Sequence, residues 1–152
     1  MQKENWKPIA GYEGLYEISD LGRVKSLARK ARFGTRVRVI KEGILSPHEQ
    51  YKGYLRVDLS KGGKATHHFV HRLVAMTFVP NPEGKPIANH LDGNKRNNRS
   101  SNFEWATDSE NTQHYYDLKK SSEHARRATY ETKRLPDVAF DDMLSHALSA
   151  LA

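Results

Sequence analysis

The pattern of apolar and polar positions changes along the chain from short alternating runs to helical spacing. Before residue 45, glycines recur too often for a helix, and several β-branched and aromatic residues favour strands. These residues are Gly11, Gly14, Gly22, Gly34 and Gly43, with Tyr16, Ile18, Val24, Val37, Val39 and Ile40. We expect a small antiparallel sheet there. Residues 54–59 alternate again, residues 61–64 (Lys-Gly-Gly-Lys) predict a hairpin turn, and residues 66–70 predict the returning strand.

Helical spacing begins after this hairpin. Apolar residues recur at helical spacing over residues 71–78, and Pro80 and Pro82 follow them. This pattern predicts a short buried helix that ends before the prolines. The polar run over residues 92–98 is rich in turn-forming residues and predicts an ordered loop.

A strand and further helices are expected beyond the loop. Residues 102–106 alternate between apolar and polar, and Thr107 and Glu110 are spaced as a capping box that opens a helix. We expect this helix to end near Lys120, a second helix over residues 122–133, and a short amphipathic helix after Pro136. Together the elements predict an α+β fold.

Composition limits the size of the core and suggests an anionic partner. The chain has 152 residues, of which 37% are hydrophobic, which is enough for one modest core with a satellite module. Its net charge is +7 and its pI is about 9.6. Lys and Arg displace the counterions that condense on a polyphosphate, so nucleic acid is the first partner to consider.

The basic residues are unevenly distributed along the sequence. Residues 21–41 hold many cations and no acid, whereas residues 135–152 hold three aspartates and no Lys or Arg. We predict phosphate contacts for the basic run, although a solvated surface would also explain it. With further cations at the predicted turn, helix and loop, the candidates are Arg23, Lys25, Arg29, Lys30, Arg32, Arg36, Arg38, Lys61, Lys64, Arg72, Lys95 and Arg96.

Several protein classes are excluded by what the sequence lacks. There is no cysteine, which removes disulfides, thiolate nucleophiles and cysteine-based zinc sites. The first residues are polar, and no apolar run approaches the ~18 residues that a membrane span needs. We expect a cytoplasmic protein that does not enter a membrane.

Two sequence motifs occur in a characteristic order. Residues 89–95 (Asn-His-Leu-Asp-Gly-Asn-Lys), followed by 97–98, 102–105 and 109–111, resemble the core of the HNH endonuclease family. The preceding residues 71–75 resemble its phage and intron branch, which includes homing endonucleases. Residues 6–19 and 22–24 resemble the small DNA-binding module that often precedes such nuclease domains.

The resemblance implies a fold and a domain order. It implies a β-rich DNA-binding module over residues 1–60 and a ββα-metal (HNH, His-Me finger) nuclease domain over 61–120. A helical C-terminal tail over 121–152 would follow. Double-stranded DNA is the implied partner, and the acidic end of the tail would contact another protein or the basic surface of its own chain.

The resemblance also implies roles for individual residues. His90 would be the general base, since an imidazole with a pKa of ~6.5 accepts a proton near neutral pH. Asn89 and Asn111 would provide oxygen ligands to one divalent ion, Mg²⁺ or Mn²⁺. His114 would be a further ligand or a phosphate contact. Asn102 would tie the polar loop to the strands and so orient His90.

Alternatives remain open at this point. His67, His68 and His71 resemble a metal cluster, but neighbouring strand residues point to opposite faces, so we interpret them as solvated or packing residues. A DNA-binding protein without cleavage activity would share the basic charge. A phage packaging or recombination accessory that nicks DNA with low specificity would share the motif. The oligomeric state is not determined by the sequence.

Overall fold

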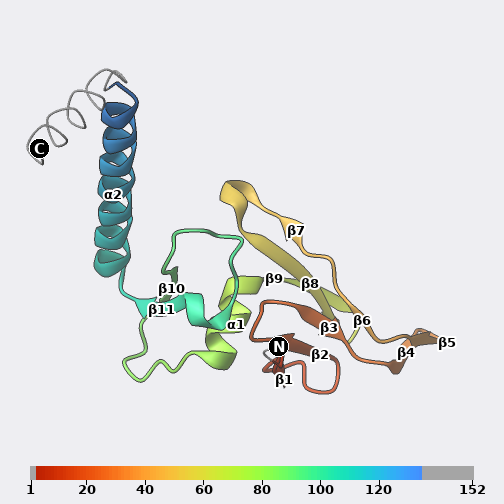
Figure 1. Cartoon of the computed structure of the whole chain (residues 1–152). Coiled ribbons are helices and arrows are strands. Elements are labelled where there is room, and N and C mark those ends of the chain that lie inside the picture. The colour runs from red at the N-terminus through yellow and green to blue at the C-terminus, as the bar shows by residue number, and fades with distance from the viewer. Residues whose placement is uncertain (1–2, 135–152) are drawn as a thin grey trace, which may run out of the picture. The chain divides into compact units, whose positions relative to one another are not determined.

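The structure, a computed structural model, describes residues 3–134 (Figure 1). The chain divides into two compact units, Met1–Asn111 and Thr112–Ala152. The helix predicted after Pro136 and the acidic stretch assigned to a protein partner both lie outside the described residues.

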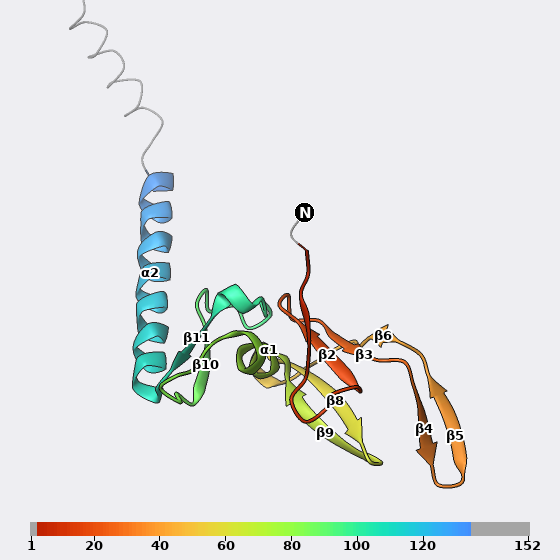
Figure 2. The same ribbon diagram turned by 90° about the horizontal axis from the view of Figure 1, so that it is seen from below.

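The first sheet of the N-terminal unit is antiparallel, as the sequence predicts. Its strand order is β1-β2-β3-β6, with bounds β1 Trp6–Pro8, β2 Tyr16–Ser19, β3 Val24–Ser26 and β6 Gly43–Ile44. Between β3 and β6 the chain forms a separate hairpin of β4 (Arg29–Phe33) and β5 (Arg36–Ile40). Figure 2 shows this hairpin extending away from the sheet. The sequence did not distinguish it from the sheet, because both have strand-forming residues.

The second sheet contains the predicted Lys-Gly-Gly-Lys hairpin. Strands β7 (His48–Glu49), β8 (Leu55–Lys61) and β9 (Lys64–Phe69) pair in that order. The short 3-10 helix η1 (Tyr51–Gly53) connects β7 to β8. Lys61 pairs with Lys64, and Gly62 and Gly63 have φ angles of 58° and 78°. A two-residue turn with two positive φ angles matches the twist of the strands, so the glycines determine this register.

A strand pair and two helices complete the described structure. Helix α1 (Val70–Phe78) leads to β10 (Ile87–His90), the 3-10 helix η2 (Ser100–Asn102), β11 (Phe103–Ala106) and helix α2 (Asp108–Arg134). Strands β10 and β11 are antiparallel, with Asn89 opposite Glu104 and His90 opposite Phe103. The capping box is confirmed: Thr107 N donates to Glu110 Oε2 (2.8 Å), and Glu110 N donates to Thr107 Oγ1 (3.2 Å).

Helix α2 corrects the prediction of two helices with a break near Lys120. It is continuous from Asp108 to Arg134, because the segment has no Gly or Pro to end it. Ser122 Oγ instead donates to the Lys119 carbonyl at 2.7 Å, which is a bond within the helix. Within residues 3–134, no helix is both long and apolar enough to cross a bilayer.

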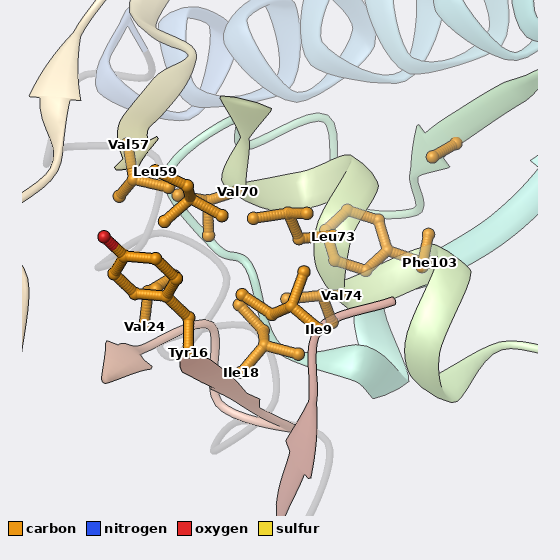
Figure 3. Packing of buried hydrophobic residues seen from close by; sticks show 12 residues of the cluster. Ile9, Tyr16, Ile18, Val24, Val57, Leu59, Val70, Leu73, Val74 and Phe103 are labelled. Carbon is orange, nitrogen blue, oxygen red and sulfur yellow. The ribbon is translucent and has the colours of Figure 1, made fainter. Parts of the chain in front are cut away.

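One hydrophobic core joins the two sheets to α1 and to the β10-β11 pair (Figure 3). The first sheet contributes Ile18, the second contributes Leu59, α1 contributes Val74 and β11 contributes Phe103, each 5% exposed or less. The boundary predicted at residue 60 therefore separates segments that share a core. Burying these side chains stabilises the N-terminal module and the strand pair together.

We expect the module and the strand pair to unfold in one cooperative transition, because neither has a core of its own. Trp6 and Trp105 are the only tryptophans and lie on β1 and β11. Variants Trp6→Phe and Trp105→Phe leave one fluorescent reporter each, and their urea transitions should share a midpoint. Leu59→Ala should lower the unfolding free energy seen by both reporters by about 2–5 kcal/mol. Two separate midpoints would contradict the shared core.

Candidate active site

His90 is the last residue of β10 and is 5% exposed. Its Nε2 lies 3.2 Å from Oδ1 of Asn98, whose side chain is also 5% exposed. An amide oxygen only accepts hydrogen bonds, so Nε2 carries the proton and the lone pair lies on Nδ1. The geometry therefore selects the His90 tautomer whose Nδ1 can accept a proton.

Aromatic rings surround the His90 imidazole. Their centroids lie 4.7 Å away for Phe103, 5.4 Å for His71 and 6.1 Å for Tyr54. Burial lowers the pKa of His90 below 6.5; the Asn98 hydrogen bond and the Asp92 charge raise it, but less than burial lowers it. His90 is therefore neutral at pH 7, the form that a general base needs.

His71 is a half-buried histidine that lies beside His90 and is neutral at pH 7. Burial, together with the smaller effects of the nearby His90 and Arg72, lowers its pKa to about 4. Its Nδ1 is buried and has no hydrogen-bond partner among the described residues. His67 and His68 lie elsewhere: His67 bonds Asp58 at 2.6 Å, and His68 bonds the Tyr12 hydroxyl at 3.0 Å.

The loop after β10 is held by side-chain amides. Asn102 Nδ2 donates to Asp92 Oδ1 and to the Asn97 carbonyl, both at 2.9 Å, and Asn102 Oδ1 accepts from Asp92 N at 3.2 Å. Asn102 thus ties the loop to the strands, as expected from the sequence. The direct hydrogen bond to His90 comes from Asn98, which the sequence placed in the motif without a role.

The predicted metal ligands come from two elements. Asn89 is 8% exposed, and its Nδ2 donates to Glu104 Oε1 at 2.9 Å. Asn111 lies in the first turn of α2, where its backbone N donates to the Thr107 carbonyl at 3.0 Å. His114 lies one helical turn later, in the unit Thr112–Ala152. Within residues 3–134, no three His, Cys, Asp or Glu side chains are grouped as a metal site, so the amide oxygens are the donors to consider.

Several predicted phosphate-binding residues make contacts within the protein. Their partners are Glu4 for Arg23, Glu17 for Lys25, Glu49 for Arg96, the Leu15 and Leu27 carbonyls for Arg29, the Gly11 carbonyl for Lys61, the Pro86 carbonyl for Arg72 and the Tyr54 ring for Lys95. These cations help to hold the fold together. Lys64, at the turn between β8 and β9, is exposed.

Four of the predicted phosphate-binding cations are exposed on the β4-β5 hairpin. Residues paired across two strands share a face, so Lys30 and Arg32 lie on one face and Arg36 and Arg38 on the other. Apolar side chains alternate with them, and Phe33, Val37 and Val39 are at least 50% exposed. Solvent reaches both faces, which leaves this ribbon available to a partner.

Known proteins resemble the chain over these same elements. Residues 4–60 match the NUMOD4 motif, and residues 68–113 match the HNH endonuclease family. The DNA endonuclease I-HmuI of Bacillus phage SP01 is 43% identical over 103 residues, which cover 67% of this chain and 52% of that protein. An uncharacterized HNH endonuclease of Acanthamoeba polyphaga mimivirus is 40% identical over 121 residues, covering 76% of this chain and 27% of that protein.

A solved structure supports the same relationship. It is a structure of the HNH homing endonuclease I-HmuI from work on DNA binding and cleavage by that enzyme. This chain superposes on it with a TM-score of 0.61 and 34% sequence identity. The match covers 80% of this chain and 66% of that chain. The chain spans about half, or less, of the curated relatives named above. The likeness confirms the predicted α+β fold with a small antiparallel sheet before a ββα finger.

Burial of His71 predicts a loss of stability in acid. Its folded pKa of about 4 lies below 6.5, so its stabilising contribution is complete above pH 6.5 and is lost as the pH falls towards 4. Between these limits the wild type should lose about 3 kcal/mol of unfolding free energy through this residue. His71→Phe keeps a ring without a titrating group, so urea unfolding at pH 7 and 4.5 should show a smaller loss. His48→Phe, at an exposed strand position, should behave like the wild type; equal losses in all three proteins would contradict the assignment.

Proposed function

The chain belongs to the HNH endonuclease family, and from this premise we propose that it is a homing-type DNA endonuclease that hydrolyses phosphodiester bonds with His90 as general base. One observation carries the proposal: a buried, neutral imidazole donates from Nε2 to Asn98, which leaves the Nδ1 lone pair to accept a proton. A base positioned in this way takes a proton from an attacking water and contributes typically 10²–10⁴-fold to the rate. Asn98 and Asn102 would hold the base and its loop.

We propose that Asn89 and Asn111 hold one divalent ion, Mg²⁺ or Mn²⁺, through their amide oxygens. Hard cations prefer oxygen ligands, so the donor set fits these ions. When bound, the ion would stabilise negative charge on the phosphate. Asn89 Nδ2 is directed to Glu104, which fixes the amide so that its oxygen points away from that carboxylate. For His114 the sequence prediction stands, either as a further ligand or as a phosphate contact.

The β4-β5 ribbon is the proposed main contact with double-stranded DNA. The major groove is wide enough for a two-stranded β-ribbon. Lys30, Arg32, Arg36 and Arg38 are exposed on the ribbon, and none of them forms an ion pair with another of residues 3–134, unlike Arg23, Lys25 and Arg96. Phosphate contacts by these cations would position the chain, and the apolar side chains between them would touch base edges.

The proposed division of labour follows the order of the motifs. Residues 1–60 would bind DNA, residues 61–120 would cut it, and residues 121–152, of which the structure describes those up to 134, would form a tail. We propose that the protein acts in the cytoplasm of the cell that holds its target DNA. Whether one strand or both are cut depends on how many chains act together, because one finger has one catalytic centre.

Incubation of the protein with supercoiled plasmid and Mg²⁺ or Mn²⁺ should give relaxed or linear DNA. The His90→Ala variant should still bind DNA, but its cleavage rate should be lower by at least about 100-fold.

The cleavage rate should also depend on pH, because the base must be unprotonated. Burial holds the pKa of His90 below 6.5, so kcat/KM should be constant above neutral pH and fall as the pH drops through the pKa of His90. Gel analysis of the plasmid measures both effects. Bound but uncut DNA with the wild type under every metal condition would identify a DNA-binding protein without cleavage activity.

Removal of the ribbon cations should weaken DNA binding and reduce its dependence on salt. Each lost phosphate contact lowers the slope of log K against log salt by about 0.9. Lys30→Ala with Arg32→Ala, and Arg36→Ala with Arg38→Ala, should each lower the slope in fluorescence anisotropy titrations of a duplex. Lys85→Ala is the control, because Lys85 already pairs with Glu83 and Glu110. An unchanged slope in both double variants would place the DNA elsewhere.

A further inference from the structure

We propose that the turn between β2 and β3, centred on Gly22, positions Asn98 and thereby orients His90. The proposal rests on the proposed endonuclease function. It assigns the N-terminal module a second task besides DNA binding, which is to complete the support of the active-site histidine. Gly22 and Asp20 would be positioning residues, since they would act on His90 through Asn98 and its neighbours.

The backbone of Gly22 lies directly against Asn98. Gly22 has a φ of +84°, and a methyl group placed on its Cα would lie 2.7 Å from Asn98 Cβ and 2.7 Å from the Asn98 carbonyl oxygen. Non-bonded carbon and oxygen atoms do not pack this closely. The Asn98 oxygen belongs to the backbone and Cβ is bonded to it, so the clash could be relieved only by a shift of the Asn98 backbone. Only glycine lets the turn approach Asn98 this closely.

A hydrogen bond ties the same turn to the other side of Asn98. The Ser100 backbone N donates to the Asp20 carbonyl at 2.8 Å. Asp20 is itself held, because Oδ1 accepts from Asn5 N at 3.1 Å and Oδ2 accepts from Asn5 Nδ2 at 3.0 Å. The turn thus contacts the chain at Asn98 and again two residues later.

Internal hydrogen bonds make the turn a firm support. Ser19 is fully buried, and its Oγ accepts from Leu21 N at 3.3 Å and from Arg23 N at 3.0 Å. Gly22 N donates to the Ser19 carbonyl at 3.0 Å. The turn therefore resists a displacement of Asn98 towards it, because these hydrogen bonds would have to break. The chain of contacts runs from the first sheet through Gly22 and Asn98 to His90 Nε2.

The sequence offers a matched control at Gly14. Gly14 has a φ of +76°, and no atom lies within 4 Å of a methyl group placed on it. Gly14→Ala and Gly22→Ala therefore share the backbone strain of an alanine at positive φ, but only Gly22→Ala pushes on Asn98. A difference between the two variants reports the contact with Asn98.

Single-turnover cleavage of a duplex and DNA affinity should be measured for the wild type, both glycine variants, Asn98→Ala and the double variant Gly22→Ala/Asn98→Ala. Gly22→Ala should lower the single-turnover rate about 10- to 100-fold, as loss of supporting contacts does at other sites, with DNA affinity unchanged. Gly14→Ala should cleave like the wild type. In the Asn98→Ala background, Gly22→Ala should have no further effect, because its action passes through the Asn98 amide.

Spectroscopy separates positioning from loss of fold. The imidazole ¹⁵N chemical shifts of His90 should show the Nε2-protonated tautomer in the wild type and in Gly14→Ala, and a mixture in Gly22→Ala. If Gly22→Ala does not fold, Ser100→Pro breaks the hydrogen bond to Asp20 at the first residue of η2 and should lower the rate in the same way.

Two results would overturn the inference. One is a cleavage rate for Gly22→Ala that equals the rate for Gly14→Ala. The other is a Gly22→Ala substitution that lowers the rate by the same factor in the wild type and in Asn98→Ala. Both require a wild type that cleaves DNA, so they differ from failure of the proposed function, in which the wild type itself leaves DNA intact.

Discussion

The hydrogen bond from His90 to Asn98 is the interaction on which the candidate site depends. Both side chains are 5% exposed, and a buried polar group that loses its partner costs more than the bond itself contributes. The bond decides which imidazole nitrogen keeps a lone pair, and therefore what chemistry His90 can perform. Aromatic neighbours and a turn of the N-terminal module lie around the pair, so the tautomer of His90 depends on contacts from several parts of the unit.

The two sheets share one core with α1 and the strand pair that carries His90. Ile18 and Leu59 from the two sheets pack with Val74 and Phe103 from α1 and β11. Such packing fixes the position of the turn at Gly22 against Asn98 to within the tolerance that positioning requires. The ribbon of β4 and β5 is much more exposed to solvent than this core, since Val37 is 57% exposed and Val39 is 71% exposed. The turn beside Asn98 and the exposed ribbon thus lie in parts of the module with different burial.

Local chemistry made much of the fold predictable. The Lys-Gly-Gly-Lys turn, the prolines after α1 and the Thr107–Glu110 capping box each act within a few residues, so the sequence contains the whole interaction. The predicted break in α2 was wrong because serines near Lys120 can bond within a helix as well as cap one. Residue types alone do not distinguish these two uses.

The sequence by itself determined the family resemblance, the Lys-Gly-Gly-Lys hairpin, the short buried helix, the capped start of α2, the basic charge, and the histidine and amides that form the candidate site. Only the tertiary structure decided which cations are exposed and which pair with Glu4, Glu17 and Glu49, because those acids are distant in sequence or on other strands. It also decided that Asn98, rather than Asn102, bonds His90, and that Gly22 abuts Asn98 across 76 positions of the chain. Periodicity and motifs record short-range geometry, whereas these contacts arise when separate segments bury one another.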